Sequence, residues 1–243
     1  MSIKIGSLFS GIGSLELGLE RSIPNSETVW QVEQDKFCQS ILAKHWPDTQ
    51  LYNDVYDVGV HNLESVDIIC GGFPCQDIAI CGKQGGIYGK RSGLWWEMQR
   101  IISELRPRVV VVENVPNLYV LGMREVLGAM AEIGYDAEWT TISAAQCGAP
   151  HKRNRVWIVA YPTGQRLPRQ RQCQPPINSK TYENWETSQF IHAVQIGAVP
   201  YMCRDHNGAT NRVDKLKALG NSIVPQCSEW IGQQIINAKL LDF

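Results

Sequence analysis

The stretch IKIGSLFSGIG, residues 3–13, decides the fold that this chain is expected to adopt. Residues 3–9 are a mainly apolar run of strand length, and residues 10–13 are typical of a tight turn. Residues 14–21 then carry leucines suited to a short helix. A strand that leads through a glycine turn into a helix opens a βαβ unit, and the backbone of such a turn can approach a ligand closely.

The alternation of strand and helix continues along the chain. Apolar and β-branched runs predict further strands at residues 28–32, 66–70 and 108–112. Apolar residues at helical spacing predict helices at residues 36–45, 93–105 and 126–133. This order predicts an α/β fold built on a mostly parallel sheet.

The next segment departs from the parallel pattern. Residues 136–143 and 155–161 read as two strands joined by a Gly-Ala-Pro turn, close enough to pair as an antiparallel hairpin. Residues 162–212 are then rich in Pro, Gln and Asn and show weak periodicity, which indicates a separate small module or an ordered insert. The sheet is therefore expected to be mostly parallel with an antiparallel hairpin at its edge.

Composition limits the class of protein. The chain has 243 residues, 44% of them hydrophobic, and contains neither an apolar run of membrane-spanning length nor a signal pattern. Its eight cysteines form no Cys-x-x-Cys pair, and its histidines are not paired at zinc spacing. These features predict a soluble cytoplasmic protein with reduced thiols, no metal site and no membrane partner.

The charge distribution indicates where a partner could bind. The formal net charge is only -1, yet residues 151–182 contain seven Lys or Arg and no Asp or Glu. A basic segment in a near-neutral protein suits local contact with a polyanion such as nucleic acid. A solvated basic loop is the alternative.

The turn after the first strand indicates a cofactor containing adenosine. Glu33 ends the second strand, 22 residues after Gly11, where a carboxylate can bind both ribose hydroxyls. Asp54, after a short third segment, could receive the adenine amine. Glu16 replaces the last glycine of the dinucleotide fingerprint, so these residues do not distinguish NAD from S-adenosylmethionine.

Cys75 lies in the sequence GGFPCQ, directly after the strand at residues 66–70. A cysteine at the carboxyl end of a buried parallel strand stands where ligands bind, although a buried structural thiol is the usual role of this residue type. Glu113 ends the valine-rich strand and should reach the same edge. A thiolate and a carboxyl group together suit addition to an unsaturated ring, with the acid supporting charge on a ring nitrogen.

Arg153 and Arg155 stand two residues apart at the entrance to the strand at residues 155–161. Strand alternation would place both guanidinium groups on one face. Facing the edge that carries Cys75, they could hold a carbonyl oxygen or a phosphate and favour the thiolate. Solvated surface arginines remain the alternative.

Five ordered motifs make the chain resemble the DNA (cytosine-5)-methyltransferase family, in its short bacterial or phage type. The motifs are FSGIG (9–13), FPCQ (73–76), ENV (113–115), QCGAPHKRNR (146–155) and GNSIV (220–224). They extend over nearly the whole catalytic part of the chain, which makes the resemblance specific. It implies a Rossmann-like fold that uses S-adenosylmethionine as cofactor, with a small target-recognition module.

The resemblance also implies a mechanism. Cys75 would attack C6 of a cytosine flipped out of double-stranded DNA, while Glu113 contacts N3 and the exocyclic amine. C5 would then take the methyl group, and elimination would release the thiol. Arg155 would hold the cytosine O2, and Arg153 would order the site. The implied cofactor-binding residues are Phe9, Ser10, Gly11, Ile12, Gly13, Glu33, Asp54, Pro74, Leu94 and Asn221.

The family pattern divides the chain into a catalytic domain, residues 1–160 and 213–243, and a target-recognition region, residues 161–212. The last helix should pack beside the first strand, with Asn221 or Ser222 as its N-cap and Pro225 in its first turn. The arginine-glutamate motif that usually follows the recognition region has no clear counterpart here. How that region docks is therefore left open.

The expected partner is double-stranded DNA, bound by a monomer in a bacterial or phage-infected cell, with a cognate restriction endonuclease as a possible companion. Three alternatives remain open. The catalytic motifs suit tRNA equally well, because a related branch of the family modifies RNA. A catalytically silent DNA-binding homologue is a second reading. An NAD oxidoreductase is a weaker third, because no residue suits hydride transfer better than thiol addition.

Overall fold

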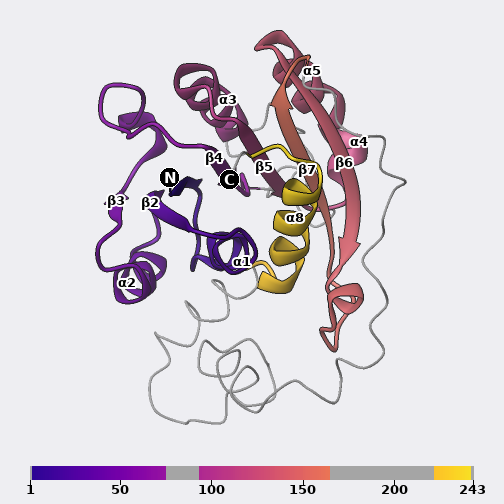
Figure 1. The fold of residues 1–243 in the computed structure, drawn as a ribbon, viewed down its shortest axis with the longest axis horizontal. Helices are drawn as coiled ribbons and strands as arrows, with labels where there is room; N and C mark the ends of the chain where they lie inside the picture. Colours follow the sequence, from indigo (N-terminus) through magenta and orange to yellow (C-terminus); the bar gives the residue numbers. More distant parts are fainter. Residues whose placement is uncertain (1, 75–92, 165–221, 242–243) are drawn as a thin grey trace.

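The computed structural model describes residues 2–74, 93–164 and 222–241. Within these ranges the strands form one seven-stranded sheet in the order β3-β2-β1-β4-β5-β7-β6 (Figure 1). The strands are β1 (Ile3–Leu8), β2 (Ser26–Val32), β3 (Gln50–Tyr52), β4 (Ile68–Gly71), β5 (Val109–Asn114), β6 (Tyr135–Ser143) and β7 (Asn154–Pro162). The helices are α1 (Ser14–Ser22), α2 (Lys36–His45), η1 (Val55–Asp57), α3 (Leu94–Leu105), α4 (Leu118–Leu121), α5 (Met123–Glu132), η3 (Ala144–Cys147) and α8 (Pro225–Asn237).

The sheet is parallel from β3 to β5 and antiparallel beyond it. β1 pairs with both β2 and β4, and β4 pairs with β5, all in parallel. β7 pairs antiparallel with β5 and with β6. This confirms the predicted α/β sheet with its antiparallel edge hairpin. The strand order reverses direction at β1, and ligands bind to open α/β sheets at such a switch point, beyond the carboxyl ends of the strands.

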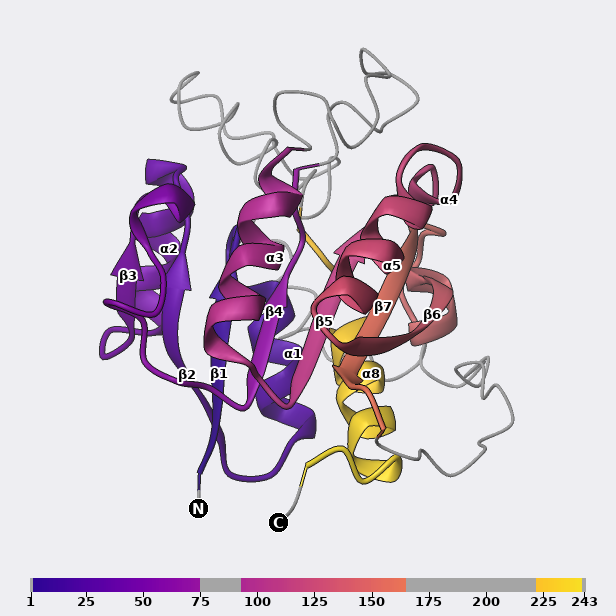
Figure 2. The same cartoon turned by 90° about the horizontal axis from the view of Figure 1, so that it is seen from above.

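Helices cover both faces of the sheet, α3 and α5 on one and α1, α2 and α8 on the other (Figures 1 and 2). The side chains of the valine run in β5 point alternately to the two faces of the sheet. Val110 and Val112 belong to the core beneath α3 and α5, whereas Val109 and Val111 belong to the core shared with α1 and α8. A strand buried on both sides explains why this run is continuously apolar.

The helices and strands predicted from the sequence are mostly present, but some of their end residues and caps differ from the prediction. α2 has the predicted bounds, whereas α5 begins earlier than predicted, after an additional short helix, α4. The prediction that Ser222 caps the last helix is wrong. Val224 occupies the N-cap position of α8, and its side chain forms no capping hydrogen bond. Pro225 begins α8, so its fixed φ starts the helix without a polar cap. Asn221 lies outside the described residues.

The C-terminal helix α8 packs on α1 through small residues. A Cβ on Gly18 of α1 would stand 2.0 Å from Ser228 Oγ and 2.3 Å from the Pro225 carbonyl oxygen. A Cβ on Gly232 of α8 would stand 2.0 Å from Ser22 Oγ. α8 also shares its core cluster with Ile3 and Ile5 of β1. The last helix thus packs on α1, the helix that follows the first strand, and lies in the same core cluster as that strand.

Among the helices of the described ranges, none has both the length and the apolar character needed to cross a bilayer.

The α1–α8 contact yields a prediction about stability. Gly18→Ala forces a methyl group into the Pro225 backbone, so it should lower the free energy of unfolding by about 1–3 kcal/mol through overpacking. Gly128→Ala in α5 is the matched control, because a Cβ there meets no atom within 4 Å in the part of the chain that the structure describes. The control should raise stability by about 0.5–1 kcal/mol, the usual helix preference for Ala over Gly. Urea unfolding measures both, and equal effects would contradict the contact.

Candidate active site at the carboxyl edge of the sheet

The turn after β1 is held by hydrogen bonds to itself and to β2. Gly13 N donates to Ser10 O (2.9 Å), and Ser10 N donates to Val32 O (3.1 Å). Ser10 Oγ lies 2.9 Å from Ser7 Oγ, so this side chain turns inward rather than toward a ligand. Phe9 and Gly11 have φ values of 56° and 57°, and a non-glycine residue in that region is uncommon. The turn is a fixed structure whose backbone, rather than the Ser10 side chain, faces outward.

The two glycines of the turn serve different purposes. A Cβ on Gly11 would meet no atom of the described residues within 4 Å, so among these residues its backbone stands in open space. A Cβ on Gly13 would lie 2.2 Å from the Trp46 ring, and the neighbouring Ile12 is buried with Cys38 of α2. Gly11 therefore allows close approach of a ligand, while Gly13 and Ile12 pack the turn against α2.

Glu33 links this turn to the end of β2. Its two carboxylate oxygens each accept one backbone hydrogen bond of 2.7 Å, Oε2 from Gly11 N and Oε1 from Asp35 N. Burial raises the pKa of Glu33 above its usual range, against the effect of these bonds. Each oxygen retains a further acceptor site, so the carboxylate can still accept two ribose hydroxyls. The residues present therefore fit a nucleoside beside Gly11.

The remaining described cofactor residues stand at the same edge. Asp54 precedes η1 and accepts from Tyr56 N (3.1 Å) through Oδ1. Phe9 and Leu94 are partly buried against the core cluster beneath α3. Pro74 follows β4, the neighbour of β1.

Glu113 is a buried carboxyl group at the end of β5, 7% exposed. Its Oε1 lies 2.7 Å from Arg155 Nε at the start of β7. A Cβ on Gly72 would stand 2.8 Å from Glu113 Oε2, so the absent side chain at Gly72 leaves this oxygen room beside the exit of β4. The predicted juxtaposition of Glu113 and Arg155 is thus present.

Two effects oppose each other at Glu113. Burial raises its pKa to about 7, while the charges of Arg155 and Arg153 and the hydrogen bond from Arg155 lower it. The result is a carboxyl group that can hold or release a proton near neutral pH, as a group that supports charge on a ring nitrogen must.

Arg153 reaches the site differently from the prediction. It precedes β7 and has a φ of 25°, so strand alternation does not apply to it. Its Nη2 donates to Ser222 O (2.5 Å), which ties the approach to β7 to the segment before α8. Its charge still lowers the pKa of Glu113. Arg153 therefore acts on the site from the loop, and Arg155 from the strand.

Asn114 is a site residue that the sequence analysis missed. Its buried side chain donates from Nδ2 to Phe73 O (3.1 Å) and accepts from Val115 N (2.8 Å) through Oδ1. The bond to Phe73 fixes the chain two residues before Cys75. Phe73 also packs on Trp95, with the two ring centroids 5.4 Å apart. In the sequence, the signal for Asn114 was its position directly after Glu113. Cys75 itself lies outside the described residues, as does Asn221.

Glu16, at the last position of the incomplete glycine fingerprint, is fully buried. Gln31 Nε2 donates to its Oε1 at 3.3 Å. Burial raises its pKa to about 7, against hydrogen bonds from Ser7 and Gln31. The carboxyl group thus lies beneath the cofactor turn, between β1 and β2, instead of facing a ligand.

The described residues hold no group of three or more His, Cys, Asp or Glu side chains arranged for a metal ion.

A mostly parallel sheet with a glycine turn tied to an acidic strand end is typical of α/β proteins that bind ligands at the carboxyl ends of their strands, and here a buried acid and an arginine lie beside the same edge. The model of the C-5 cytosine-specific DNA methylase family matches residues 3–199, and the chain belongs to that family.

Curated relatives agree with this assignment. The chain is 34% identical over 166 residues to the Type II methyltransferase M2.BsuMI of Bacillus subtilis, covering 65% of this chain and 42% of that protein. It is 32% identical over 158 residues to the Type II methyltransferase M.HhaI of Haemophilus parahaemolyticus, covering 63% and 47%. The matched regions span about half the length of these relatives.

Solved structures share the fold. A prophage-encoded protein of E. coli, described as a DNA modification methyltransferase, superposes with a TM-score of 0.58 and 25% identity, over 72% of this chain and 51% of its own. The DNMT2 of Spodoptera frugiperda superposes with a TM-score of 0.57 and 22% identity, over 72% and 55%.

The buried acid beneath the turn yields a pH prediction. Because the pKa of Glu16 is raised to about 7 in the fold from an ordinary 4.5, the folded state binds its proton more tightly than the unfolded chain. Its contribution to stability is therefore full below about pH 4.5 and is lost as pH rises through about 7. Glu16→Gln should flatten this fall in the free energy of unfolding. Urea titrations across this range measure it.

The exposed Glu132→Gln on α5 is the control and should keep the wild-type slope. A Glu16→Gln protein with an unchanged slope would show that Glu16 is charged in the fold.

Proposed function

We propose that this chain transfers a methyl group from S-adenosylmethionine to C5 of a cytosine flipped out of double-stranded DNA, through a covalent bond between Cys75 and C6. One observation carries the proposal. A buried carboxyl group with a pKa near 7, Glu113, stands beside an arginine and beside the strand exit that leads to Cys75. Membership of the C-5 cytosine-specific DNA methylase family supports the same chemistry.

The proposed reaction begins with the thiolate of Cys75, which adds to C6 of the cytosine. The C5–C6 π electrons shift to C4–C5 and the C4–N3 π electrons move onto N3, where protonated Glu113 donates its proton and also contacts the exocyclic amine. C5 would then bond to the methyl carbon while the bond from that carbon to the sulfonium sulfur of the cofactor breaks, which leaves S-adenosylhomocysteine. A base removes the C5 proton, and the freed electron pair restores the C5–C6 double bond as the C6–S bond breaks and the thiolate leaves with its electron pair. N3 returns its proton to Glu113.

The arginines have separate proposed tasks. Arg155 is held against Glu113 at 2.7 Å and offers further N–H donors to the cytosine O2. Arg153 orders the loop before β7 through its bond to Ser222 O. Two positive charges near the strand exit also favour the thiolate of a cysteine, whose ordinary pKa is about 8.5.

S-adenosylmethionine supplies the electrophilic methyl group when it is bound. We assign its ribose to Glu33, and its adenine to Asp54 and the wall formed by Phe9. The rest of the pocket is assigned to the backbone of the turn at Ser10, Gly11, Ile12 and Gly13, and to Pro74, Leu94 and Asn221. The open space at Gly11 and the two carboxylate oxygens of Glu33 support this assignment. Glu113, which we assign to the cytosine, lies at the end of β5, the strand next to β4.

Recognition of the nucleic acid is assigned to residues 161–212, with residues 1–160 and 213–243 as the catalytic domain. The basic segment at residues 151–182 would contact phosphates, and extrusion of the base would cost a few kcal/mol. We further propose a monomer acting in the cytoplasm of a bacterial or phage-infected cell, with a cognate restriction endonuclease as a possible partner. Names of relatives as Type II methyltransferases support the last point.

The proposal predicts a thiol-dependent covalent adduct. Wild-type protein with S-adenosylmethionine and duplex DNA containing 5-fluorocytosine should form a complex stable in denaturing gels, because fluorine cannot leave C5 as a proton does. Cys75→Ser should form none. Cys38→Ala, which removes a buried thiol of α2, is the control and should retain the adduct. Adduct formation by Cys75→Ser would contradict the mechanism.

The same assay separates the alternatives. Labelled cofactor offered with duplex DNA or with tRNA identifies the nucleic acid that is methylated. Binding of DNA without methyl transfer or adduct would identify a catalytically silent homologue. Bisulfite sequencing of DNA from cells that express the chain would then locate the target sequence.

Glu113 predicts the pH dependence of methyl transfer. With its pKa raised to about 7, its protonated fraction falls as pH rises through that value, while the thiolate fraction of Cys75 rises. The pH profile of kcat/KM should therefore be bell-shaped, with an alkaline limb caused by Glu113. Glu113→Gln should lose this limb and lower the rate by about 10²–10⁴-fold, the usual worth of a general acid. An unchanged limb in this variant would exclude Glu113 as the proton donor.

A further inference from the structure

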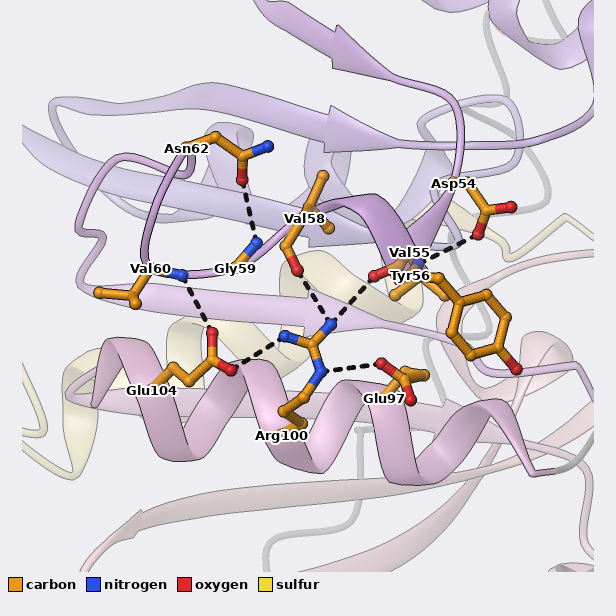
Figure 3. Close-up of polar contacts among 10 residues, drawn as sticks. All are labelled: Asp54, Val55, Tyr56, Val58, Gly59, Val60, Asn62, Glu97, Arg100 and Glu104. Atoms are coloured by element: carbon orange, nitrogen blue, oxygen red, sulfur yellow. Dashed lines mark hydrogen bonds and ion pairs between the residues drawn. The ribbon is translucent and has the colours of Figure 1, made fainter.

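Arg100 of α3 forms an unusually complete set of contacts for a surface arginine, with every nitrogen of its guanidinium engaged (Figure 3). Nε donates to Glu97 Oε2 (2.8 Å) and Nη1 to Glu104 Oε1 (2.9 Å), both on the same helix. These two carboxylates hold the guanidinium in one orientation. Ion pairs between helix residues three or four apart stabilise a helix only slightly, so the helix alone does not account for this arrangement.

The third nitrogen reaches a different part of the chain. Arg100 Nη2 donates to Val55 O (3.1 Å) and to Val58 O (2.9 Å), the backbone of the segment that follows β3. Glu104 Oε2 accepts from Val60 N (3.0 Å) in the same segment. Arg100 and Glu104 thus fix three backbone groups of residues 55–60 to α3 (Figure 3).

This segment leaves little room for another arrangement. Val55 and Val58 are buried in the core beneath α3. Gly59 N donates to Asn62 Oδ1 (3.0 Å), and Asn62 Nδ2 donates to Asp57 O (2.9 Å). A Cβ on Gly59 would lie 2.5 Å from Glu104 Oε2 and 3.0 Å from Arg100 Nη1, so the close approach of the two side chains needs a glycine there.

The segment begins at Asp54, the residue assigned to adenine. Asp54 Oδ1 accepts from Tyr56 N, and Asp54 O accepts from Asp57 N (3.2 Å), so its carboxylate belongs to the turn that Arg100 holds. We infer that Arg100 is a positioning residue for the cofactor: it acts through Asp54, whose Oδ2 it keeps in place for the adenine amine. This inference rests on the proposed function, because it takes S-adenosylmethionine as the ligand.

A fixed carboxylate binds more tightly than one that must first be ordered, because the cost of ordering is subtracted from the free energy of binding. Arg100 should therefore act on affinity for the cofactor and leave the chemical step unaffected. Lysine cannot replace it fully, since one ammonium group cannot match the planar fork that spans two carboxylates and two carbonyls.

The test is the dissociation constant of S-adenosylmethionine, measured by calorimetry on the full chain. Arg100→Met should raise the Kd, and the KM for the cofactor, about tenfold, an effect of about 1.4 kcal/mol, while kcat at saturating cofactor changes less than about twofold. Arg100→Lys should lie between Arg100→Met and the wild type. The control is Arg21→Met, which removes the Arg21–Glu229 ion pair (3.2 Å) between α1 and α8 and should leave the Kd unchanged.

A double-mutant cycle with Asp54→Ala separates positioning from a general loss of structure. If Arg100 acts through Asp54, the combined variant should bind the cofactor almost as well as Asp54→Ala alone. Full multiplication of the two effects would overturn the inference, as would a wild-type Kd for Arg100→Met. Failure of the wild-type protein to bind S-adenosylmethionine would instead overturn the proposed function, and this inference with it.

A second variant guards against misfolding. Gly59→Ala keeps the charge of Arg100 and displaces Glu104 Oε2 and Arg100 Nη1 from the other side of the contact. It should weaken cofactor binding in the same direction. If thermal unfolding shows that Arg100→Met is not folded, a wild-type Kd for Gly59→Ala would overturn the inference.

Discussion

The antiparallel pairing of β7 with β5 is the constraint on which the candidate site depends. A parallel strand at this position would bring its carboxyl end to the edge where β5 ends. Because β7 runs the other way, its first residues reach that edge, and Arg155 meets Glu113 at 2.7 Å. The pair is buried at the end of a strand with core on both faces, so burial sets the pKa of the acid and the arginine moderates it. The hairpin at the edge of the sheet is thus part of the site.

Two neighbouring strands give the rest of the site its arrangement. β1 leads into the glycine turn that Glu33 holds, and β4, paired beside β1, leads toward Cys75. Since parallel neighbours end at the same edge, the assigned cofactor pocket and the assigned nucleophile are adjacent without any long-range adjustment. Asn114 strengthens this arrangement, because its bond to Phe73 O joins the exit of β4 to the end of β5. The exit of β4 is therefore fixed from the same strand that carries the buried acid.

Much of this could be predicted from the sequence. Periodicity gave most strands and helices to within a few residues, because the central strands β1, β4 and β5 are mainly apolar and the main helices have an apolar stripe. The short elements β3 and α4 were not predicted. Glu113 and Arg155 could be placed at one edge from strand ends alone. Other roles could not be read. Gly13 looks like a ligand-binding glycine, yet its missing side chain makes room for Trp46 of a segment more than 30 residues away. The capping of the last helix also failed, since a proline start replaced a polar cap.

The sequence by itself determined the fold class and the family resemblance, and the proposed reactive groups come from it as well, because all of these depend on residue type, order and local spacing. Tertiary structure decided which carboxyl groups are buried. Glu16 and Glu33 are both acidic residues near the turn, but packing makes Glu16 a buried acid, whereas Glu33 accepts a backbone hydrogen bond from Gly11, beside open space. It also decided that Arg100 reaches Val55 and Val58, some 40 residues away in the chain. Such contacts depend on how the helices pack on the sheet, and no local pattern in the sequence specifies that packing.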